Sequence, residues 1–237
     1  MLTEDARAID TRHLGFTMSP HEECGVEEAV RIIEANKGDS VVLTLGPAES
    51  VEQLRDAMAL GVDRAIHLET DGQEWDGEAT ADAITDAIRA DEAANGPFDL
   101  IFFGNESADS GGFQVGIRVA YALGRPCVTG LKKVTVEGTN VRCEQEVEGG
   151  RDVYVVPLPA VLTVKEGLNL PRYPSVPGKM RARSKPVAVS APMRPAPRLE
   201  LVSLAVPGGQ GRRAESLGTG ATAAPAVVEV LRKAGVL

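Results

Sequence analysis

The fold class of this 237-residue chain is set by one short stretch, Val41-Val-Leu-Thr-Leu-Gly-Pro47. Residues 41–45 are aliphatic or β-branched without a break, which is typical of a strand buried on both faces of a parallel sheet. Apolar residues at helical spacing precede this strand from Val26 and follow it over residues 51–60. A helix is therefore expected on either side of it in the sequence.

Three further segments repeat the alternation of strand and helix: a strand at 65–68, a helix at 79–90 and a strand at 99–103. After Pro126, three segments alternate apolar with polar residues and are separated by Gly138-Thr139 and Gly149-Gly150, which predicts β-hairpins. Residues 160–164 are apolar throughout and are expected to return to the main sheet. The predicted fold is α/β, with an open, mostly parallel sheet, flanking helices, an inserted β-hairpin and an extended C-terminal arm with a terminal helix.

We expect two parts in this chain. Residues 1–190 are predicted to form the α/β domain. Residues 191–237 are predicted to form an extended arm, because prolines and glycines are frequent up to residue 215. A helix over 224–233, with Pro225 in its first turn, is expected to close the arm and to dock on a partner subunit.

Composition excludes several classes of protein. The net charge is −9, which argues against a nucleic-acid-binding protein because such proteins need a basic face. No apolar run approaches the ~20 residues that span a bilayer, and no signal peptide opens the chain, so a cytoplasmic location is expected. The cysteines are too few and too scattered for a disulfide framework or a zinc site: Cys24, Cys127 and Cys143.

A glycine-rich loop spans residues 104–118, directly after the strand at 99–103. In open parallel sheets, ligands bind at the carboxyl ends of the strands, and the amides that start the next helix favour a phosphate. Asp109 and Gln114 are candidates to fix a ribose or a base by hydrogen bonds. The spacing matches neither the Walker loop nor Gly-x-Gly-x-x-Gly, so an ordinary βα loop capped by Asp109 or Ser110 is the alternative.

The pattern contains no catalytic signature. His13, His21 and His67 are far apart in the sequence, and spacing supports no Ser/His/Asp or Cys/His arrangement. The 34 acidic residues do not single out an acid/base pair. By pattern alone, the residues indicate a binding protein and do not specify its ligand.

The proline-rich stretch Leu168–Lys185 interrupts the alternation of strands and helices. Its prolines predict a stiff, exposed loop that is neither helix nor central strand, with Tyr173 and Val176 presented to solvent. Basic residues follow at every second position: Lys179, Arg181, Arg183 and Lys185. Such a surface indicates a docking partner, and a plain connection between subdomains is the alternative.

Together, these residues resemble the β subunit of electron transfer flavoprotein, including its FixA-type bacterial members. The resemblance spans roughly residues 15–185 and, more weakly, the last helix. Its most specific parts are Val26-Glu-Glu-Ala29, Gly46-Pro47, Ala57-Met-Ala-Leu-Gly-Val-Asp63, Gly104 to Gly116, Leu158-Pro-Ala-Val161 and Leu168 to Met180.

The resemblance implies an electron carrier that forms a heterodimer with an α subunit, not an enzyme that transforms a substrate. In the family, FAD lies mainly on the α chain and the β chain binds a buried AMP, so residues 1–190 are expected to be a nucleotide-binding domain. The implied electron donors are flavin dehydrogenases such as acyl-CoA dehydrogenase, in fatty acid oxidation. The implied acceptor is a quinone oxidoreductase or a similar protein.

The resemblance also maps functional residues onto this chain. The implied cofactor-binding residues are Ser19, His21, Leu45, Ser107, Asp109, Gly111, Gly112, Gln114, Val115 and Gly116. Ser19-Pro20-His21 takes the place of an Asn-Pro-Phe segment, so His21 is expected near the edge of the flavin. The proline-rich stretch resembles the family's recognition loop, whose implied docking residues are Tyr173, Val176, Lys179 and Met180. Val176 replaces a leucine anchor, and the missing methylene weakens the contact by about 0.8 kcal/mol.

Two departures from the family pattern bear on these expectations. Relatives begin with an apolar strand and a Lys-x-Val-Pro-Asp stretch that has no match here, so the sheet is expected to lack its first, central strand and part of the AMP wall. Gly111-Gly112 stands where relatives carry bulkier or acidic residues. We expect AMP, and two alternatives stay open: an electron-bifurcating subunit with FAD in the AMP site, and a stand-alone adenine-nucleotide-binding regulator.

Overall fold

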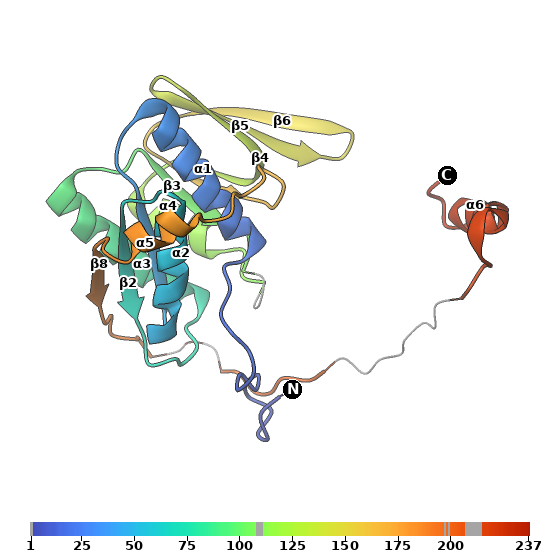
Figure 1. Cartoon of the computed structure of the whole chain (residues 1–237), viewed down its shortest axis with the longest axis horizontal. Helices are drawn as coiled ribbons and strands as arrows, with labels where there is room; N and C mark the ends of the chain where they lie inside the picture. Colours follow the sequence, from blue (N-terminus) through green and yellow to red (C-terminus); the bar gives the residue numbers. More distant parts are fainter. Residues whose placement is uncertain (1, 108–110, 197, 199, 207–214) are drawn as a thin grey trace. The chain divides into compact units, whose positions relative to one another are not determined.

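The structure is a computed structural model that describes residues 2–107, 111–196, 198, 200–206 and 215–237 (Figure 1). The elements follow one another in this order: α1 (Pro20–Asn36), β1 (Val41–Gly46), the 3-10 helix η1 (Ala48–Ser50), α2 (Val51–Leu60), β2 (Arg64–Glu69), α3 (Gly77–Asn95), β3 (Leu100–Gly104), α4 (Val115–Leu123), β4 (Cys127–Glu137), β5 (Asn140–Val147), β6 (Gly150–Pro157), β7 (Ala160–Val164), α5 (Val176–Ala182), β8 (Val187–Ser190), the 3-10 helix η2 (Gly220–Ala223) and α6 (Ala224–Lys233). The chain divides into two units, one of residues 11–200 and one of residues 1–10 with 201–237.

The strands of the larger unit form two hydrogen-bonded sheets. One has the order β1-β2-β8 and is parallel throughout. The other has the order β3-β7-β4-β5-β6, in which β3, β7 and β4 are parallel and β5 and β6 extend the sheet as antiparallel hairpins. The predicted α/β class with a mostly parallel open sheet and flanking helices is confirmed. Residues 160–164 do return to the main sheet, where β7 pairs with both β3 and β4.

Helices cover both faces of the strands. Alternate side chains of a strand point to opposite faces, and in β2 they enter different apolar clusters: Ile66 and Leu68 pack with α3 and α4, whereas Ala65 packs with α2. The fully buried strand is β7, whose five residues are all buried. This burial explains why the sequence of β7 is apolar without alternation.

β1 and β3 are each the end strand of their sheet. Apolar side chains of both strands pack in the same cluster with α3. Every residue of β3 and all but the last of β1 are nevertheless half-buried. Among the described residues, no strand pairs with the second edge of either one.

The proline-rich stretch contains a helix that the sequence interpretation excluded. Residues 176–182 form α5, with Pro177 in its first turn. The Ser175 hydroxyl caps this helix by accepting a hydrogen bond from the Gly178 amide at 3.1 Å. Proline breaks the interior of a helix but suits its first turn, where its missing amide has no intrahelical acceptor to lose. The prediction of a loop without helix was therefore wrong for residues 176–182.

The smaller unit joins the N-terminal residues to the C-terminal segment. Leu2 and Ile9 form an isolated antiparallel bridge, and the Leu204 amide donates to the Ala6 carbonyl at 2.7 Å. Its helix α6 has no buried residue, and its apolar side chains are exposed: Val227, Val228, Val230 and Leu231. A helix of this length needs packing of its apolar side to be stable.

Candidate functional site

The first turn of α1 lies against the end of β3. An added Cβ at Gly104 would overlap the carboxylate of Glu22, so the glycine lets that side chain lie directly against the end of the strand. Ser19, the N-cap residue of α1, donates its hydroxyl to the same carboxylate. The carboxyl end of a parallel strand and the start of a helix therefore meet at this point, where open α/β sheets bind their ligands.

His21 joins three segments of this edge. Its Nδ1 accepts a hydrogen bond from the backbone amide of Glu166 at 2.8 Å, and its Nε2 lies 3.2 Å from the carboxylate of Glu106. Because Nδ1 is the acceptor, the ring proton is on Nε2 and is donated to Glu106. One side chain thus ties the start of α1 to the loop after β3 and to the loop after β7.

Ser107 shapes the loop between β3 and α4. Gly111 donates its amide to the Ser107 carbonyl at 2.9 Å, and Gly112 donates its own to the Ser107 hydroxyl at 3.0 Å. Gly111 has φ of 65°, a conformation that favours glycine. Among the described residues, none has an atom within 4 Å of a Cβ added at Gly111, so they leave the space beside it open.

The start of α4 packs closely on the sheet. An added Cβ at Gly116 would lie 2.9 Å from Cγ2 of Thr163, so only glycine allows this approach. The Gln114 side chain accepts a hydrogen bond from Nε of Arg118 at 2.8 Å. The Arg118 amide also donates to the Gln114 carbonyl at 2.9 Å, which is the first hydrogen bond of the helix. The amides of residues 115–117 precede it and have no acceptor within the helix.

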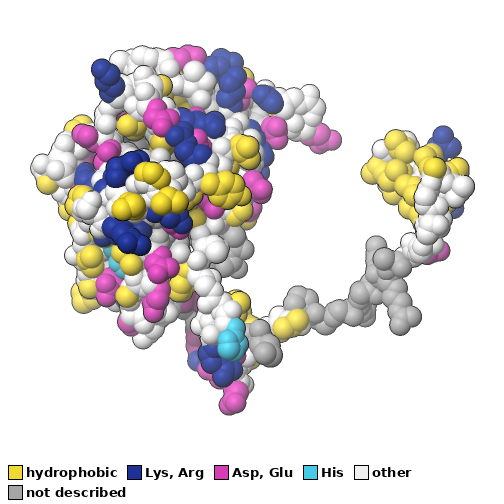
Figure 2. All heavy atoms as spheres, in the orientation of Figure 1, with side chains coloured by type: hydrophobic (Ala, Val, Ile, Leu, Met, Phe, Trp, Pro, Cys, Tyr) yellow, Lys and Arg dark blue, Asp and Glu magenta, His cyan; other side chains and the backbone are white. Residues whose placement is uncertain are grey.

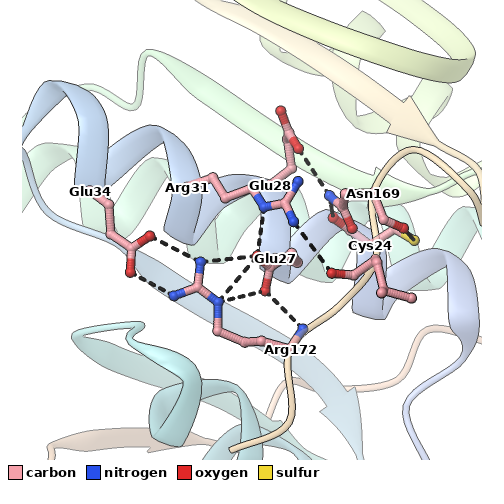
Figure 3. A network of polar contacts seen from close by, with 8 residues as sticks. Cys24, Glu27, Glu28, Arg31, Glu34, Asn169 and Arg172 are labelled. Carbon is pink, nitrogen blue, oxygen red and sulfur yellow. Dashed lines mark hydrogen bonds and ion pairs between the residues drawn. The ribbon is translucent and has the colours of Figure 1, made fainter.

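A second set of polar contacts holds the stretch after β7 on α1 (Figure 3). The Glu27 carboxylate is almost fully buried, and it accepts hydrogen bonds from Nε of Arg31 at 2.7 Å and from Nε and Nη2 of Arg172 at 2.9 and 3.0 Å. The backbone amide of Arg172 donates to the same carboxylate at 3.2 Å. Burial raises the pKa of Glu27, but the hydrogen bonds from Arg172 and Arg31 outweigh this effect and the pKa is lowered. Glu27 is therefore an ionised carboxylate inside the protein at neutral pH.

The network extends along one side of α1. Arg172 uses Nη1 and Nη2 to bind Glu34 at 2.6 and 3.0 Å. The Asn169 side chain donates to the Cys24 carbonyl at 3.0 Å and to Glu28 at 2.9 Å. The α1 residues of the network recur in steps of three and four and so lie on one helix face: Cys24, Glu27, Glu28, Arg31 and Glu34. Residues 169–172 are thus fastened to that face.

Four apolar side chains within and directly after this anchored stretch face solvent. We call these four the docking patch: Leu170, Tyr173, Val176 and Met180 are exposed by 85%, 97%, 75% and 68%. Exposed cations neighbour them in the sequence: Lys179, Arg181 and Arg183. Figure 2 shows apolar side chains surrounded by Lys and Arg over α5. An apolar surface with a basic border therefore lies on a chain of net charge −9.

α5 is seated on α2 at the far end of the docking patch. Nη1 of Arg55 donates to the carbonyls of Ala182 and Lys185 at 2.6 and 2.7 Å. Nζ of Lys185 donates in turn to carbonyls at the end of α2, those of Met58 at 3.1 Å and Val62 at 2.6 Å. Lys185 was expected in the exposed basic run, and that interpretation was wrong because the free carbonyls at a helix C-terminus attract a cation.

Comparison with known families gives this arrangement its context. Residues 7–193 match the model of the electron transfer flavoprotein domain. The chain is 37% identical over 192 residues to the electron transfer flavoprotein subunit beta of Bacillus subtilis, which covers 78% of this chain and 73% of the relative. The subunit beta of Syntrophomonas wolfei is 33% identical, with coverage of 82% and 75%, and that of Mus musculus is 34% identical, with coverage of 78% and 72%. This chain belongs to the electron transfer flavoprotein β-subunit family.

Membership in the electron transfer flavoprotein family confirms the resemblance drawn from the sequence. It makes the chain an electron carrier subunit with an α-subunit partner and an association with flavin. Among the described residues, no group of His, Cys, Asp or Glu is arranged to hold a metal ion. In the same part of the chain, no helix is long and apolar enough to cross a membrane.

The structure sorts the cofactor-binding residues expected from the electron transfer flavoprotein family into three groups. Ser19 and His21 lie with the loop that begins after β3, where Ser107, Gly111 and Gly112 form one turn. The side chains of Leu45 and Val115 pack in the apolar cluster beneath α3, and Gly116 is buried against the sheet. Gln114 begins α4, and Asp109 lies outside the described residues.

Sequence reasoning missed residues at the edge where β3 meets α1 and residues of the polar network that holds the stretch after β7 on α1. Glu22 and Glu106 stood among 34 acidic residues with no spacing to mark them. Arg172 and Glu27 are 145 residues apart, so no local pattern connects them. The only available signal was Arg172 itself, a charged residue between two prolines in a stretch already expected to be exposed.

Proposed function

We propose that this chain is the β subunit of a heterodimeric electron transfer flavoprotein that carries electrons from flavin dehydrogenases, acyl-CoA dehydrogenase among them, to a quinone oxidoreductase or a similar acceptor. The observation that supports this best is the docking patch, whose side chains are 68–97% exposed on a segment anchored at both ends. Holding apolar side chains in water is unfavourable, and a clustered set of them is typical of a protein-binding surface.

In this proposal, the FAD held mainly by the α subunit supplies the redox chemistry. This chain supplies the surface that binds the dehydrogenase. The docking patch enters an apolar recess of the dehydrogenase, and the basic border meets acidic residues around that recess. Complementary charge of this kind raises the association rate and favours the correct partner.

We also propose that AMP binds where β3 ends and α1 begins. The side chains at this edge suit a base and a ribose: the Asn105 carbonyl oxygen accepts the Thr163 hydroxyl at 2.9 Å, which leaves the Asn105 amide group as a donor. The amides at the start of α4 suit a phosphate. The open space beside Gly111 gives the nucleotide room.

Co-expression with an α-type subunit tests the proposed function. We expect a yellow heterodimer that contains one FAD and one AMP, measured by mass, by flavin absorbance and by nucleotide release on denaturation. Two FAD and no AMP would replace the AMP proposal with the bifurcating alternative. A colourless chain that purifies alone and binds AMP would favour the regulator and overturn the carrier.

The same experiment tests the arm, which we propose to dock on the α subunit through the exposed apolar residues of α6. A chain that ends at Glu200 keeps residues 11–200 and omits nearly all of the smaller unit. We expect this shortened chain to fold but no longer to co-purify with the α subunit. Recovery of an intact heterodimer from the shortened chain would contradict the proposed role of the arm.

Val176→Asp tests the docking patch. A carboxylate in the centre of an apolar contact loses its hydration without gaining a partner, so we expect kcat/KM for an acyl-CoA dehydrogenase to fall at least about tenfold, which corresponds to 1.4 kcal/mol. The flavin content of the heterodimer should not change. Val189→Asp is the matched control, because Val189 is an exposed valine on β8, outside the patch. Equal rates for the two variants would show that the stretch is only a connection.

A further inference from the structure

We propose that Arg172 is a positioning residue that orients the docking patch by clamping the start of its segment to the buried carboxylate of Glu27. This inference rests on the proposed function, because it concerns the surface through which the carrier meets its partners. Arg172 itself is not placed in the contact: its guanidinium lies between Glu27 and Glu34, and the side chain that follows it, Tyr173, is 97% exposed.

The buried position of Glu27 needs an explanation beyond stability. Its side chain is 1% exposed, and burying a carboxylate is costly even when it is well paired. Apolar residues of similar size commonly join two elements as firmly as a buried ion pair does. The ion pair adds a fixed orientation of the two joined elements, because the planar guanidinium binds a carboxylate in a fixed geometry.

The contacts of Arg172 fix both its side chain and its backbone. Nε and Nη2 bind Glu27, Nη1 and Nη2 bind Glu34, and the Arg172 amide also donates to Glu27. A side-chain contact alone would let the backbone rotate about the anchor. With the amide bound to the same carboxylate, the path of the chain into Tyr173 is set.

The two ends of the patch segment are anchored in different ways. At the α5 end, Arg55 and Lys185 bind backbone carbonyls, and Gly178 packs against α2. At the start, Asn169 and Arg172 bind α1. Tyr173, Ser175 and Val176 lie between these anchors, and Tyr173 is the most exposed side chain of the docking patch. Their orientation therefore depends on the fork of Arg172, the pair of hydrogen bonds from Nε and Nη2 to the Glu27 carboxylate.

Arg172→Lys tests this role, because it keeps the charge and removes the fork. The matched control is Arg64→Lys: Arg64 binds Asp91 through two hydrogen bonds of 2.6 Å, so it loses the same kind of fork at a site between β2 and α3. In the full heterodimer we expect Arg172→Lys to speed hydrogen exchange at least tenfold at the amides of Gly178 and Lys179, which both donate to Ser175 of the segment. Arg64→Lys should leave those amides unchanged.

Kinetics with an acyl-CoA dehydrogenase provide the second measurement. We expect Arg172→Lys to raise KM for the carrier about fivefold and to leave kcat within twofold. A loosened patch lowers the affinity of the carrier for the dehydrogenase but does not change electron transfer within the complex. Should KM rise without faster local exchange, or should Arg64→Lys raise KM as much, the positioning role is wrong. An unchanged KM for Val176→Asp would instead reject the docking surface, while hydrogen exchange still decides whether Arg172 fixes the segment.

A double variant separates orientation from stability. Glu27→Met combined with Arg172→Met replaces the ion pair by apolar side chains of similar length. We expect the melting temperature to stay close to that of the unaltered protein, with exchange at the amides of Gly178 and Lys179 as fast as in Arg172→Lys. Slow exchange in this stable double variant would overturn the proposal.

Discussion

Replacing Gly178 with alanine is expected to lower the free energy of unfolding by about 2 kcal/mol, although alanine is the better helix former. Gly178 lies in α5, and helix propensity alone predicts a gain of about 1 kcal/mol for this change. An added Cβ would overlap the backbone carbonyl of Ala59, which cannot rotate away as a side chain would. Overpacking of this kind costs up to about 3 kcal/mol, so the clash outweighs the propensity and α5 is pushed off α2.

Urea unfolding and thermal melting measure this effect. For a chain of this size, we expect a melting temperature lower by about 4–8 °C. Gly150→Ala is the matched control, because an added Cβ there meets nothing within 4 Å and no positive φ constrains the residue. A Gly178→Ala variant as stable as the control would mean that α5 does not sit on α2 as the structure describes.

The regular part of the fold is predictable because its sequence signals are local. A strand between two helical layers is apolar on both faces, and this holds for residues 41–45 and 160–164. The hairpins of β4, β5 and β6 follow from alternation and from the glycines between them. Each of these predictions needs only a short run of consecutive residues.

α5 and the Arg172 clamp were not predictable because their determinants act through tertiary contacts. Pro177 is compatible with either a loop or a first helical turn, and only the cap from Ser175 and the seat on α2 select the helix. Arg172 and its ion-pair partner Glu27 are 145 residues apart in the sequence. At the edge where β3 ends and α1 begins, the resemblance indicated Ser19 and Ser107 as candidate residues, but the bridge from His21 to Glu106 depends on how two loops meet.

Glu27→Gln is expected to make the stability of this protein less dependent on acid pH. The folded-state pKa of Glu27 is lowered, through hydrogen bonds from Arg172 and Arg31 that outweigh the effect of burial. A carboxylate with a lowered folded-state pKa contributes stability above its unfolded pKa of about 4.3. That contribution is lost as pH falls through the folded-state value.

The neutral amide that Glu27→Gln introduces would keep the size of the side chain and lose the charge that Arg172 and Arg31 bind. Hydrogen bonds to charged groups contribute about 2 kcal/mol, so at pH 7 we expect Glu27→Gln to lower the free energy of unfolding by about that amount. The difference from the unaltered protein should shrink as pH falls below the unfolded pKa of about 4.3, because the unfolded chain then takes up a proton that the folded carboxylate of Glu27 does not. Urea unfolding at pH 7, 5 and 3.5 measures this, with Glu137→Gln, an exposed residue at the end of β4, as the control. A difference that stays constant from pH 7 to pH 3.5 would mean that the charge on Glu27 is not what holds Arg172 in place.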